Sequence, residues 1–240
     1  MAILFISDLH IDATRPAITE QFIEFLRTEA RAADALYILG DLFESWVGDD
    51  AADAAQAAAI AGLKSLTAQG VPCFVMRGNR DFLLGRQFCA ASGAHLLPDP
   101  LIVTLYGEPV LVMHGDALCT DDRAYQRLRA TVRDAEWQRQ FLALSLGARR
   151  ALAGAARVGS RAHTAAMEYA ITDVNADSVA VALRTAPAAT LLHGHTHRPG
   201  IHPLNVDGRA CTRIVLGDWY TQGSVLRWDP SGPELKSLAR

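Results

Sequence analysis

The chain has 240 residues, half of them hydrophobic and a fifth charged, and its formal net charge is −3. This length suits one domain with a full core, or one domain that carries an insertion, and argues against a second independent domain. The composition is globular, no apolar run approaches the roughly 18 residues of a membrane span, and the weak negative charge predicts no nucleic-acid partner. We expect a soluble or peripheral protein with a single domain over residues 1–240.

The amino terminus reads MAILFISDLH, with no basic leader and no cleavage-like site before Asp8. This pattern predicts a cytoplasmic strand and no signal peptide. The four cysteines are scattered without CxxC spacing, so we expect reduced structural thiols.

Short apolar, β-branched runs recur along the chain as ILFIS, ALYIL, CFVM, VLVM, TLL and RIVL. Helical patterns separate the early runs over residues 18–32 and 51–69, and Gly70 and Pro72 follow the second pattern. Strands that alternate with helices predict an α/β fold whose functional loops follow the carboxyl ends of the strands.

Residues 121–175 break this rhythm. The segment is rich in Ala, Leu and Arg, has no strand signal and predicts two or three helices. We interpret it as a helical cap inserted into the same folding unit. Residues 223–240 predict a final strand pair or hairpin.

Polar side chains follow the apolar runs in a fixed order. Asp8 and His10 follow the first run, and His195 and His197 follow TLL with the same spacing. Alternate positions of an extended segment point to one side, so each pair can share an ion. Three further groups follow the intervening runs, namely Asp41 in GD, Asn79 in GN and His114 in HG.

These seven groups offer enough oxygen and nitrogen ligands for two metal ions, with one carboxylate free to bridge them. A histidine cluster alone is equally compatible with a solvated turn, and strand-end polar turns without a metal remain the alternative. The order of five separate motifs favours the metal site.

The ordered set D-x-H, GD, GN, H, GH-x-H resembles the calcineurin-like metallophosphoesterase superfamily. The resemblance implies an αββα two-sheet sandwich and a pair of metal ions that activates water for in-line displacement at phosphorus. It implies that the bridging carboxylate is Asp41. The implied ligands are Asp8, His10, Asp41 and His197 for one ion, and Asp41, Asn79, His114 and His195 for the other.

Arg80 departs from the common GNH pattern of the superfamily, because the motif here is GNRD. A guanidinium stays charged near neutral pH, so we expect Arg80 to neutralise phosphate charge and not to protonate a leaving group. A diphosphate substrate fits this change, since its leaving group is itself a phosphate. The alternative from this residue alone is that Arg80 pairs with Asp81 or with a surface acid.

Longer stretches narrow the resemblance: ALYILGDLFESWVGDD, RGNRDFLLG, MHGDALCTDD, HGHTHRPG and VLGDW. They are similar to the branch of the superfamily that cleaves UDP-2,3-diacylglucosamine in lipid A biosynthesis. The resemblance implies attack on the α-phosphorus with two Mn²⁺ ions, giving UMP and 2,3-diacylglucosamine 1-phosphate. It also implies a peripheral protein at the cytoplasmic face of the inner membrane.

A diacyl substrate would give the cap a purpose. We expect its leucines, Leu142, Leu144 and Leu152 among them, to wall an acyl groove and to touch the membrane surface, although the stripe of a buried amphipathic helix would look the same. The residues that the resemblance aligns with substrate contacts, beside Asn79 and Arg80, are Asp122, Ser160, Thr164, Met167 and His195.

Thr164 and Met167 depart from the family, which often has Asn and Lys at these positions. We expect Arg157 or Arg161 to supply the missing charge. Two other functions stay open from the sequence: a nucleotide pyrophosphatase or phosphodiesterase, such as a dinucleoside polyphosphate hydrolase, and a non-catalytic binding module on the same fold. Activity on the UDP-sugar lipid but not on dinucleoside polyphosphates would exclude the first, and metal-dependent turnover would exclude the second.

Overall fold

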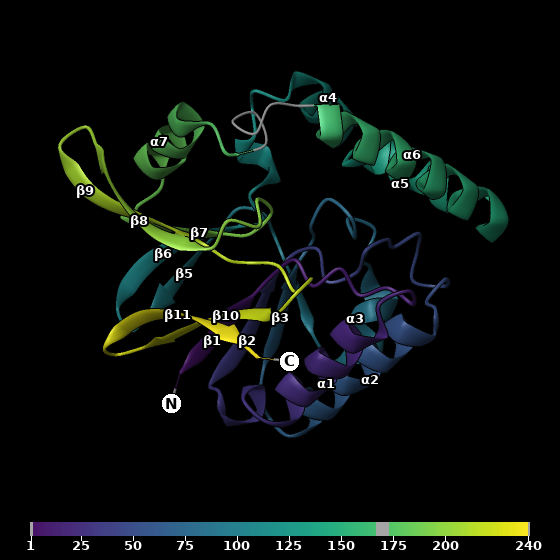
Figure 1. Ribbon diagram of the computed structural model, residues 1–240, viewed down its shortest axis with the longest axis horizontal. Helices are drawn as coiled ribbons and strands as arrows, with labels where there is room; N and C mark the ends of the chain where they lie inside the picture. Colours follow the sequence, from purple (N-terminus) through teal and green to yellow (C-terminus); the bar gives the residue numbers. More distant parts are fainter. Residues whose placement is uncertain (1, 167–172, 240) are drawn as a thin grey trace.

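The computed structural model of the protein describes residues 2–166 and 173–239. Two sheets form its centre (Figure 1). The first has the strand order β11-β10-β1-β2-β3-β4, and the second has the order β5-β6-β7-β9-β8. The strands of the first sheet are β1 (Ile3–Ile6), β2 (Ala35–Leu39), β3 (Cys73–Met76), β4 (His95–Leu97), β10 (Gly223–Asp229) and β11 (Gly232–Leu238). Those of the second are β5 (Leu101–Leu105), β6 (Glu108–Met113), β7 (Thr190–His193), β8 (Gly200–Val206) and β9 (Arg209–Val215).

Helices cover the outer face of each sheet, so the predicted αββα sandwich is confirmed (Figure 1). The first sheet packs against α1 (Pro16–Arg27), α2 (Ala54–Ala68) and α3 (Arg86–Ser92), and the second packs against α7 (Ala176–Thr185). Successive side chains of β1 point to opposite faces of the sheet. Leu4 and Ile6 belong to the hydrophobic cluster that faces the helices, and Phe5 belongs to the cluster between the two sheets.

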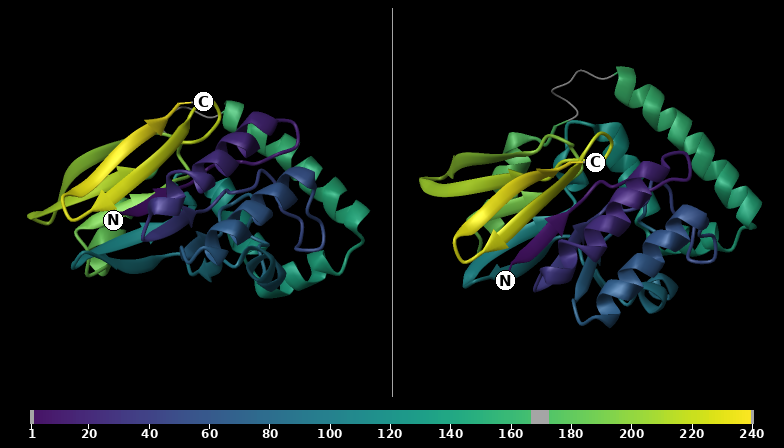
Figure 2. Two further views of the ribbon diagram at one scale, coloured as in Figure 1. Left: turned by 90° about the horizontal axis from the view of Figure 1, so that it is seen from below. Right: turned by 60° about the horizontal axis from the view of Figure 1, so that its bottom comes forward.

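The cap consists of α4 (Arg123–Val132), α5 (Ala135–Leu142) and α6 (Leu146–Ala166), and no strand interrupts the described part of residues 121–175. Short 3-10 turns, η1 (Ala30–Ala32) and η2 (Asp116–Leu118), complete the described elements. The helix α6 runs along one side of the molecule, apart from both sheets (Figure 2). No helix in the described ranges is long and apolar enough to cross a membrane.

The bounds predicted for the helix over residues 18–32 are wrong at both ends. The helix begins at Pro16, whose fixed φ suits a first helical position, and it ends at Arg27. The hydroxyl of Thr28 donates to the Glu24 carbonyl at 2.7 Å, a local bond that competes with the helical ladder. The helix predicted over 51–69 begins later, at Ala54, because Asp53 and Gln56 form a capping box.

The sequence patterns missed three strands, β4, β5 and β8. Each lies at the edge of its sheet. The β4 strand has only three residues, and most side chains of β8 are exposed. An edge strand with one weakly buried face carries little hydrophobic alternation. The predicted carboxyl-terminal hairpin is confirmed as β10 and β11.

Parallel pairing fixes where the functional loops lie. The strands β1, β2 and β3 are parallel neighbours in one sheet, and β6, β7 and β9 are parallel neighbours in the other. Their carboxyl ends therefore meet at one edge of the sandwich.

Candidate metal centre and substrate cavity

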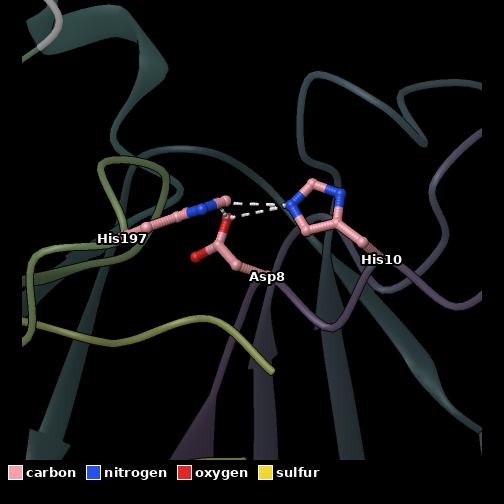
Figure 3. Close-up of side chains that lie close together, drawn as sticks. All are labelled: Asp8, His10 and His197. Carbon is pink, nitrogen blue, oxygen red and sulfur yellow. Dashed lines mark hydrogen bonds and ion pairs between the residues drawn. The ribbon is translucent and has the colours of Figure 1, made fainter. Parts of the chain in front are cut away.

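The seven predicted ligands lie together at this edge. The ligand atoms of Asp8, His10 and His197 lie within 4.8 Å of one another and point toward a common centre (Figure 3). Asp8, Asp41 and His114 form an overlapping group with the same limit. The Oδ1 atom of Asn79 lies 2.9 Å from His114 Nε2 and 2.9 Å from His195 Nδ1, which joins the remaining two ligands to the cluster.

Five of these ligands have left-handed backbone conformations. Their φ angles are 55° for Asp8, 51° for His10, 52° for Asp41, 69° for His195 and 55° for His197. Residues other than glycine rarely adopt this region, and such strain persists only where the surrounding structure enforces it. Loop-to-loop hydrogen bonds enforce it here, since the amide of Asp8 donates to the Gly40 carbonyl at 3.1 Å and that of His10 donates to the Asp41 carbonyl at 2.9 Å.

The carboxylate of Asp8 uses its two oxygens differently. Its Oδ2 atom accepts hydrogen bonds from the Ser7 hydroxyl at 2.5 Å and from the His195 amide at 2.9 Å. Its Oδ1 atom is buried, has no aligned donor among the described residues and lies 3.4 Å from His197 Nε2. A buried carboxylate oxygen without a donor, surrounded by imidazole nitrogens, fits a cation site.

The carboxylate of Asp41 faces both halves of the cluster. Its Oδ2 atom lies 3.7 Å from His10 Nε2, and its Oδ1 atom lies 3.7 Å from His114 Nε2. This is the geometry that a bridging ligand needs. Gly78 makes the close approach possible, because a Cβ atom there would lie 2.1 Å from Asp41 Oδ1.

Burial and charge divide the four histidine ligands into two classes. Burial lowers the pKa of His10 to about 4, and burial together with the charge of His114 lowers that of His195 to about 4. Burial also opposes the charged form of His114 and of His197, but neighbouring carboxylates outweigh it. Asp41 first, then Asp116 and Asp8, raise the pKa of His114 to about 9, and Asp8 raises that of His197.

His193, the first histidine of the LLHGHTHRPG stretch, does not join the cluster. It is fully buried, and its Nδ1 atom lies 2.8 Å from the Gly194 carbonyl oxygen. Burial lowers the pKa of His193 to about 4, so it is a neutral core residue near neutral pH.

Asp81 holds two ligand loops together, a role that the sequence did not reveal. Its Oδ1 atom accepts from the Gly78 amide at 2.7 Å, and its Oδ2 atom accepts from the amides of Leu42 at 2.8 Å and Phe43 at 3.3 Å. The side chain therefore fixes the loop of Asp41 to the loop of Asn79. The only feature of the sequence that could have indicated this role is the position of Asp81 directly after the GNR motif.

A cavity of about 420 Å³ lies between the cap and the cluster of predicted ligands. Asn79 and Arg80 line the part of the cavity next to the cluster. A phosphoryl group bound at the cluster would therefore lie beside the positive charge of Arg80. Most of the wall is apolar, and its large apolar residues include Trp46, Phe82, Leu83, Leu128, Val132, Trp137, Phe141 and Leu152. Of the three cap leucines that we expected in an acyl groove, only Leu152 lines this cavity. Leu142 and Leu144 are absent from its wall and are 42% and 40% exposed.

Two contact networks fasten the cap to the core. At α4, the Tyr125 hydroxyl donates to Asp116 Oδ2 at 2.6 Å, and Arg129 Nε donates to the same oxygen at 2.9 Å. At α6, Arg149 binds Asp50 with two hydrogen bonds, at 2.7 and 2.5 Å. The WVGDD stretch thus has a structural task, since Asp50 binds the cap.

The predicted substrate contacts are less clustered than the ligands. Asp122 caps the amino terminus of α4 by accepting from the Tyr125 amide at 2.9 Å, and it does not line the cavity. Arg157 lines the cavity and donates to the Glu44 carbonyl at 2.7 Å. The side chains of four further predicted contacts lie outside the described residues: Ser160, Arg161, Thr164 and Met167.

The chain is similar to proteins that are already known. The family model described as calcineurin-like phosphoesterase matches residues 1–199. A protein named UDP-2,3-diacylglucosamine hydrolase from Stenotrophomonas maltophilia (strain K279a) is 53% identical over 247 residues, which cover 100% of both chains. A protein of the same name from Xanthomonas axonopodis pv. citri (strain 306) is 52% identical over 246 residues, again with complete coverage of both. Among solved structures, one described as a novel archaeal phosphodiesterase matches all of both chains with a TM-score of 0.49 and 12% identity.

Proposed function

Because this chain belongs to the calcineurin-like phosphoesterase family, we propose that it is a metal-dependent hydrolase that cleaves the diphosphate of UDP-2,3-diacylglucosamine. The products would be UMP and 2,3-diacylglucosamine 1-phosphate, formed by attack of water on the α-phosphorus. The observation that carries the proposal is the position of the seven-ligand cluster beside a cavity whose wall is largely apolar. A cavity of this character suits the acyl chains of a lipid substrate better than it suits a soluble nucleotide.

The family has a divalent metal centre, and the cluster fits one. We propose two Mn²⁺ ions, held by the two sets of ligands that the family resemblance implies, with Asp41 shared by both sets. When bound, such a pair supplies an activated water and withdraws charge from phosphoryl oxygens. The protein residues would hold the pair in place: Asp8 would offer Oδ1, because Ser7 and the His195 amide already fix its Oδ2.

Arg80 would orient the diphosphate and neutralise its charge. Its backbone amide donates to Asp41 Oδ1 at 2.8 Å, which couples its position to that of the cluster. Its guanidinium is a poor proton donor near neutral pH, so it serves as a fixed positive charge.

We propose further that the cap places the protein at the cytoplasmic face of the inner membrane as a peripheral protein. Large apolar side chains are exposed on it, and they are Leu128, Leu142, Leu144, Leu152 and Val158. Exposed arginines accompany them, including Arg123, Arg127 and Arg150. Apolar and cationic side chains together suit an anionic lipid surface. Flotation with vesicles that contain anionic lipid should recover the protein, and V158E should reduce the recovered fraction.

The experiment that tests the function is incubation of Mn²⁺-loaded protein with UDP-2,3-diacylglucosamine, followed by mass analysis of the products. We expect UMP and 2,3-diacylglucosamine 1-phosphate, with loss of turnover in Asp41→Ala. Cleavage of a dinucleoside polyphosphate in preference to the lipid would contradict the proposed substrate. Absence of turnover on any phosphoester or phosphoanhydride with metal bound would indicate a binding module.

Leu152 and Leu142 provide a matched pair for the role of the cavity. Both side chains are about half exposed, at 52% and 42%, but only Leu152 lines the cavity. Leu152→Ser should raise the KM for the diacylated substrate more than Leu142→Ser does, with little effect of either on a small activated phosphodiester. Equal effects of the two substitutions would assign acyl binding elsewhere.

A further inference from the structure

Glu44 lies between the metal cluster and the cap. It is the last residue of the GDLFE stretch that begins after β2, and only 4% of its surface is exposed. Its amide donates to the Ile11 carbonyl at 3.1 Å, so its backbone is tied to the loop that follows β1. A buried carboxylate in this place requires compensating charge or donors.

Three side chains surround the Glu44 carboxylate, two from the loop between β1 and α1 and one from α6. His10 Nδ1 lies 2.7 Å from Oε2, and Arg15 lies 3.2 Å from the same oxygen. Arg157, on α6 of the cap, forms an ion pair with Oε1, and it also donates to the backbone carbonyl of Glu44 at 2.7 Å. Glu44 is therefore in contact with a predicted metal ligand on one oxygen and with the cap on the other.

The contact with His10 orients that ring. His10 Nδ1 and Glu44 Oε2 are 2.7 Å apart but are not aligned as a hydrogen bond. A carboxylate oxygen this close attracts an imidazole nitrogen that carries a hydrogen and repels one that carries a lone pair, so the contact favours the tautomer with the hydrogen on Nδ1. The lone pair of the ring is then on Nε2, which faces Asp41 Oδ2 at 3.7 Å and Asp8 Oδ1 at 3.9 Å. Carboxylates that hold the distal nitrogen of a histidine ligand fix its tautomer and its direction.

The contact with Arg157 extends this arrangement to the cap. If α6 moves away from the core, Glu44 loses a cationic partner, and the carboxylate that orients His10 is no longer held on its second oxygen. Both Glu44 and Arg157 also line the cavity, so an occupant of the cavity meets this same contact.

We propose that Glu44 is a positioning residue that orients His10 for metal binding, and that Arg157 couples the docking of the cap to this orientation. The inference rests on the proposed metal-binding function of the cluster and goes beyond it. Since coupling between two events is reciprocal, metal binding at His10 and docking of α6 should strengthen each other.

The test is titration of the metal-free full-length protein with Mn²⁺ in competition with a chromophoric chelator. Glu44→Ala should weaken the tighter Mn²⁺ site roughly 10- to 100-fold, the usual cost of losing a group that orients a metal ligand. Glu44→Asp should recover part of the loss, and Glu24→Gln, at an exposed glutamate of α1 that pairs with Arg27, should leave the affinity unchanged. Thermal unfolding of each metal-free variant identifies any loss of Mn²⁺ affinity that comes from misfolding. Nitrogen-15 spectra of the folded variants report the His10 tautomer as a second, separate measurement.

A double-mutant cycle tests the coupling. Arg157→Met should weaken Mn²⁺ binding in the same direction, and the double variant Glu44→Ala, Arg157→Met should be less impaired than the sum of the two single effects. Unchanged Mn²⁺ affinity and an unchanged His10 tautomer in Glu44→Ala would overturn the positioning role. Strict additivity in the cycle would overturn the coupling. None of these measurements depends on turnover, so they remain valid even if the proposed substrate is not the true one. If the protein binds no Mn²⁺ at all, the proposed metal-dependent function is itself refuted.

Discussion

The Oδ2 atom of Asp8 accepts a hydrogen bond from the backbone amide of His195 at 2.9 Å, although 187 residues separate the two positions. Asp8 follows β1 of the first sheet, and His195 follows β7 of the second. The bond therefore closes the metal cluster across both sheets. It also leaves the other oxygen of Asp8 directed at His197, 3.4 Å away.

Gly194 is required for this closure. A Cβ atom at this position would lie 2.3 Å from the Ser7 hydroxyl oxygen and 2.4 Å from Asp8 Oδ2. We expect Gly194→Ala to displace Asp8 and to remove at least one equivalent of bound metal, as measured by elemental analysis of purified protein. Gly154→Ala is the control, because nothing lies within 4 Å of its added Cβ in α6, and its metal content should equal that of the wild type. Full metal content in Gly194→Ala would show that Asp8 tolerates the displacement.

The Tyr125 hydroxyl stabilises the docked cap. It donates to Asp116, and although burial raises the pKa of that carboxyl, the charges of His114 and Arg129 outweigh burial and keep it ionised. A hydrogen bond to a buried charged group contributes about 1.5–3 kcal/mol, so Tyr125→Phe should lower the free energy of unfolding by about that amount in urea denaturation. Tyr106→Phe, which removes an exposed hydroxyl 3.5 Å from Asp34, should cost under about 0.5 kcal/mol. Similar losses in the two variants would contradict this role of Tyr125.

Asp50 should hold α6 over a wide pH range. Its hydrogen bonds to Arg149 lower its pKa below the ordinary value of 3.8, so the stabilisation is present above that pH and is lost only as pH falls through the lowered pKa. Asp50→Asn should reduce hydrogen-exchange protection of α6 equally at pH 7 and pH 5, by about 1 kcal/mol for this half-exposed carboxylate. Asp207→Asn breaks a bidentate pair with Arg184 far from the cap and should leave α6 protected. Loss of wild-type protection between pH 7 and pH 5 would contradict the assignment.

Replacement of Arg80 tests whether a fixed charge or a proton donor is needed beside the cluster. Arg80→His should lower kcat roughly 10- to 1,000-fold through loss of charge stabilisation. Its rate should not increase as pH falls through 6.5, where histidine becomes protonated. A variant faster than the wild type at low pH would mean that protonation of the leaving group limits the reaction.

The proximity of the seven predicted ligands was predictable from the sequence because backbone topology alone brings them together. Asp8, Asp41 and Asn79 follow parallel strands, and the carboxyl ends of such strands meet at one edge whatever the side chains do. The left-handed conformations at the ligands were not predictable, since Asp and His, and not glycine, occupy these five positions. They arise from hydrogen bonds between loops that only the folded chain brings into contact.

The sequence predicted that the cap consists of helices, but it did not predict which faces of these helices line the cavity. The orientation of α5 and α6 depends on distant contacts such as Arg149 with Asp50, and a leucine pattern alone does not define it. This is why Leu152 lies at the cavity while Leu142 does not. Glu44 and Asp116 were missed for the same reason, because their partners Arg157 and Tyr125 belong to separate elements.

Hydrolysis of UDP-2,3-diacylglucosamine by the Mn²⁺-loaded protein in water enriched in oxygen-18 tests the proposed reaction most directly. We expect one labelled oxygen in UMP and none in 2,3-diacylglucosamine 1-phosphate, with turnover abolished by Asp41→Ala and by chelation. Label in the sugar phosphate, or turnover no greater than that of Asp41→Ala, would contradict it.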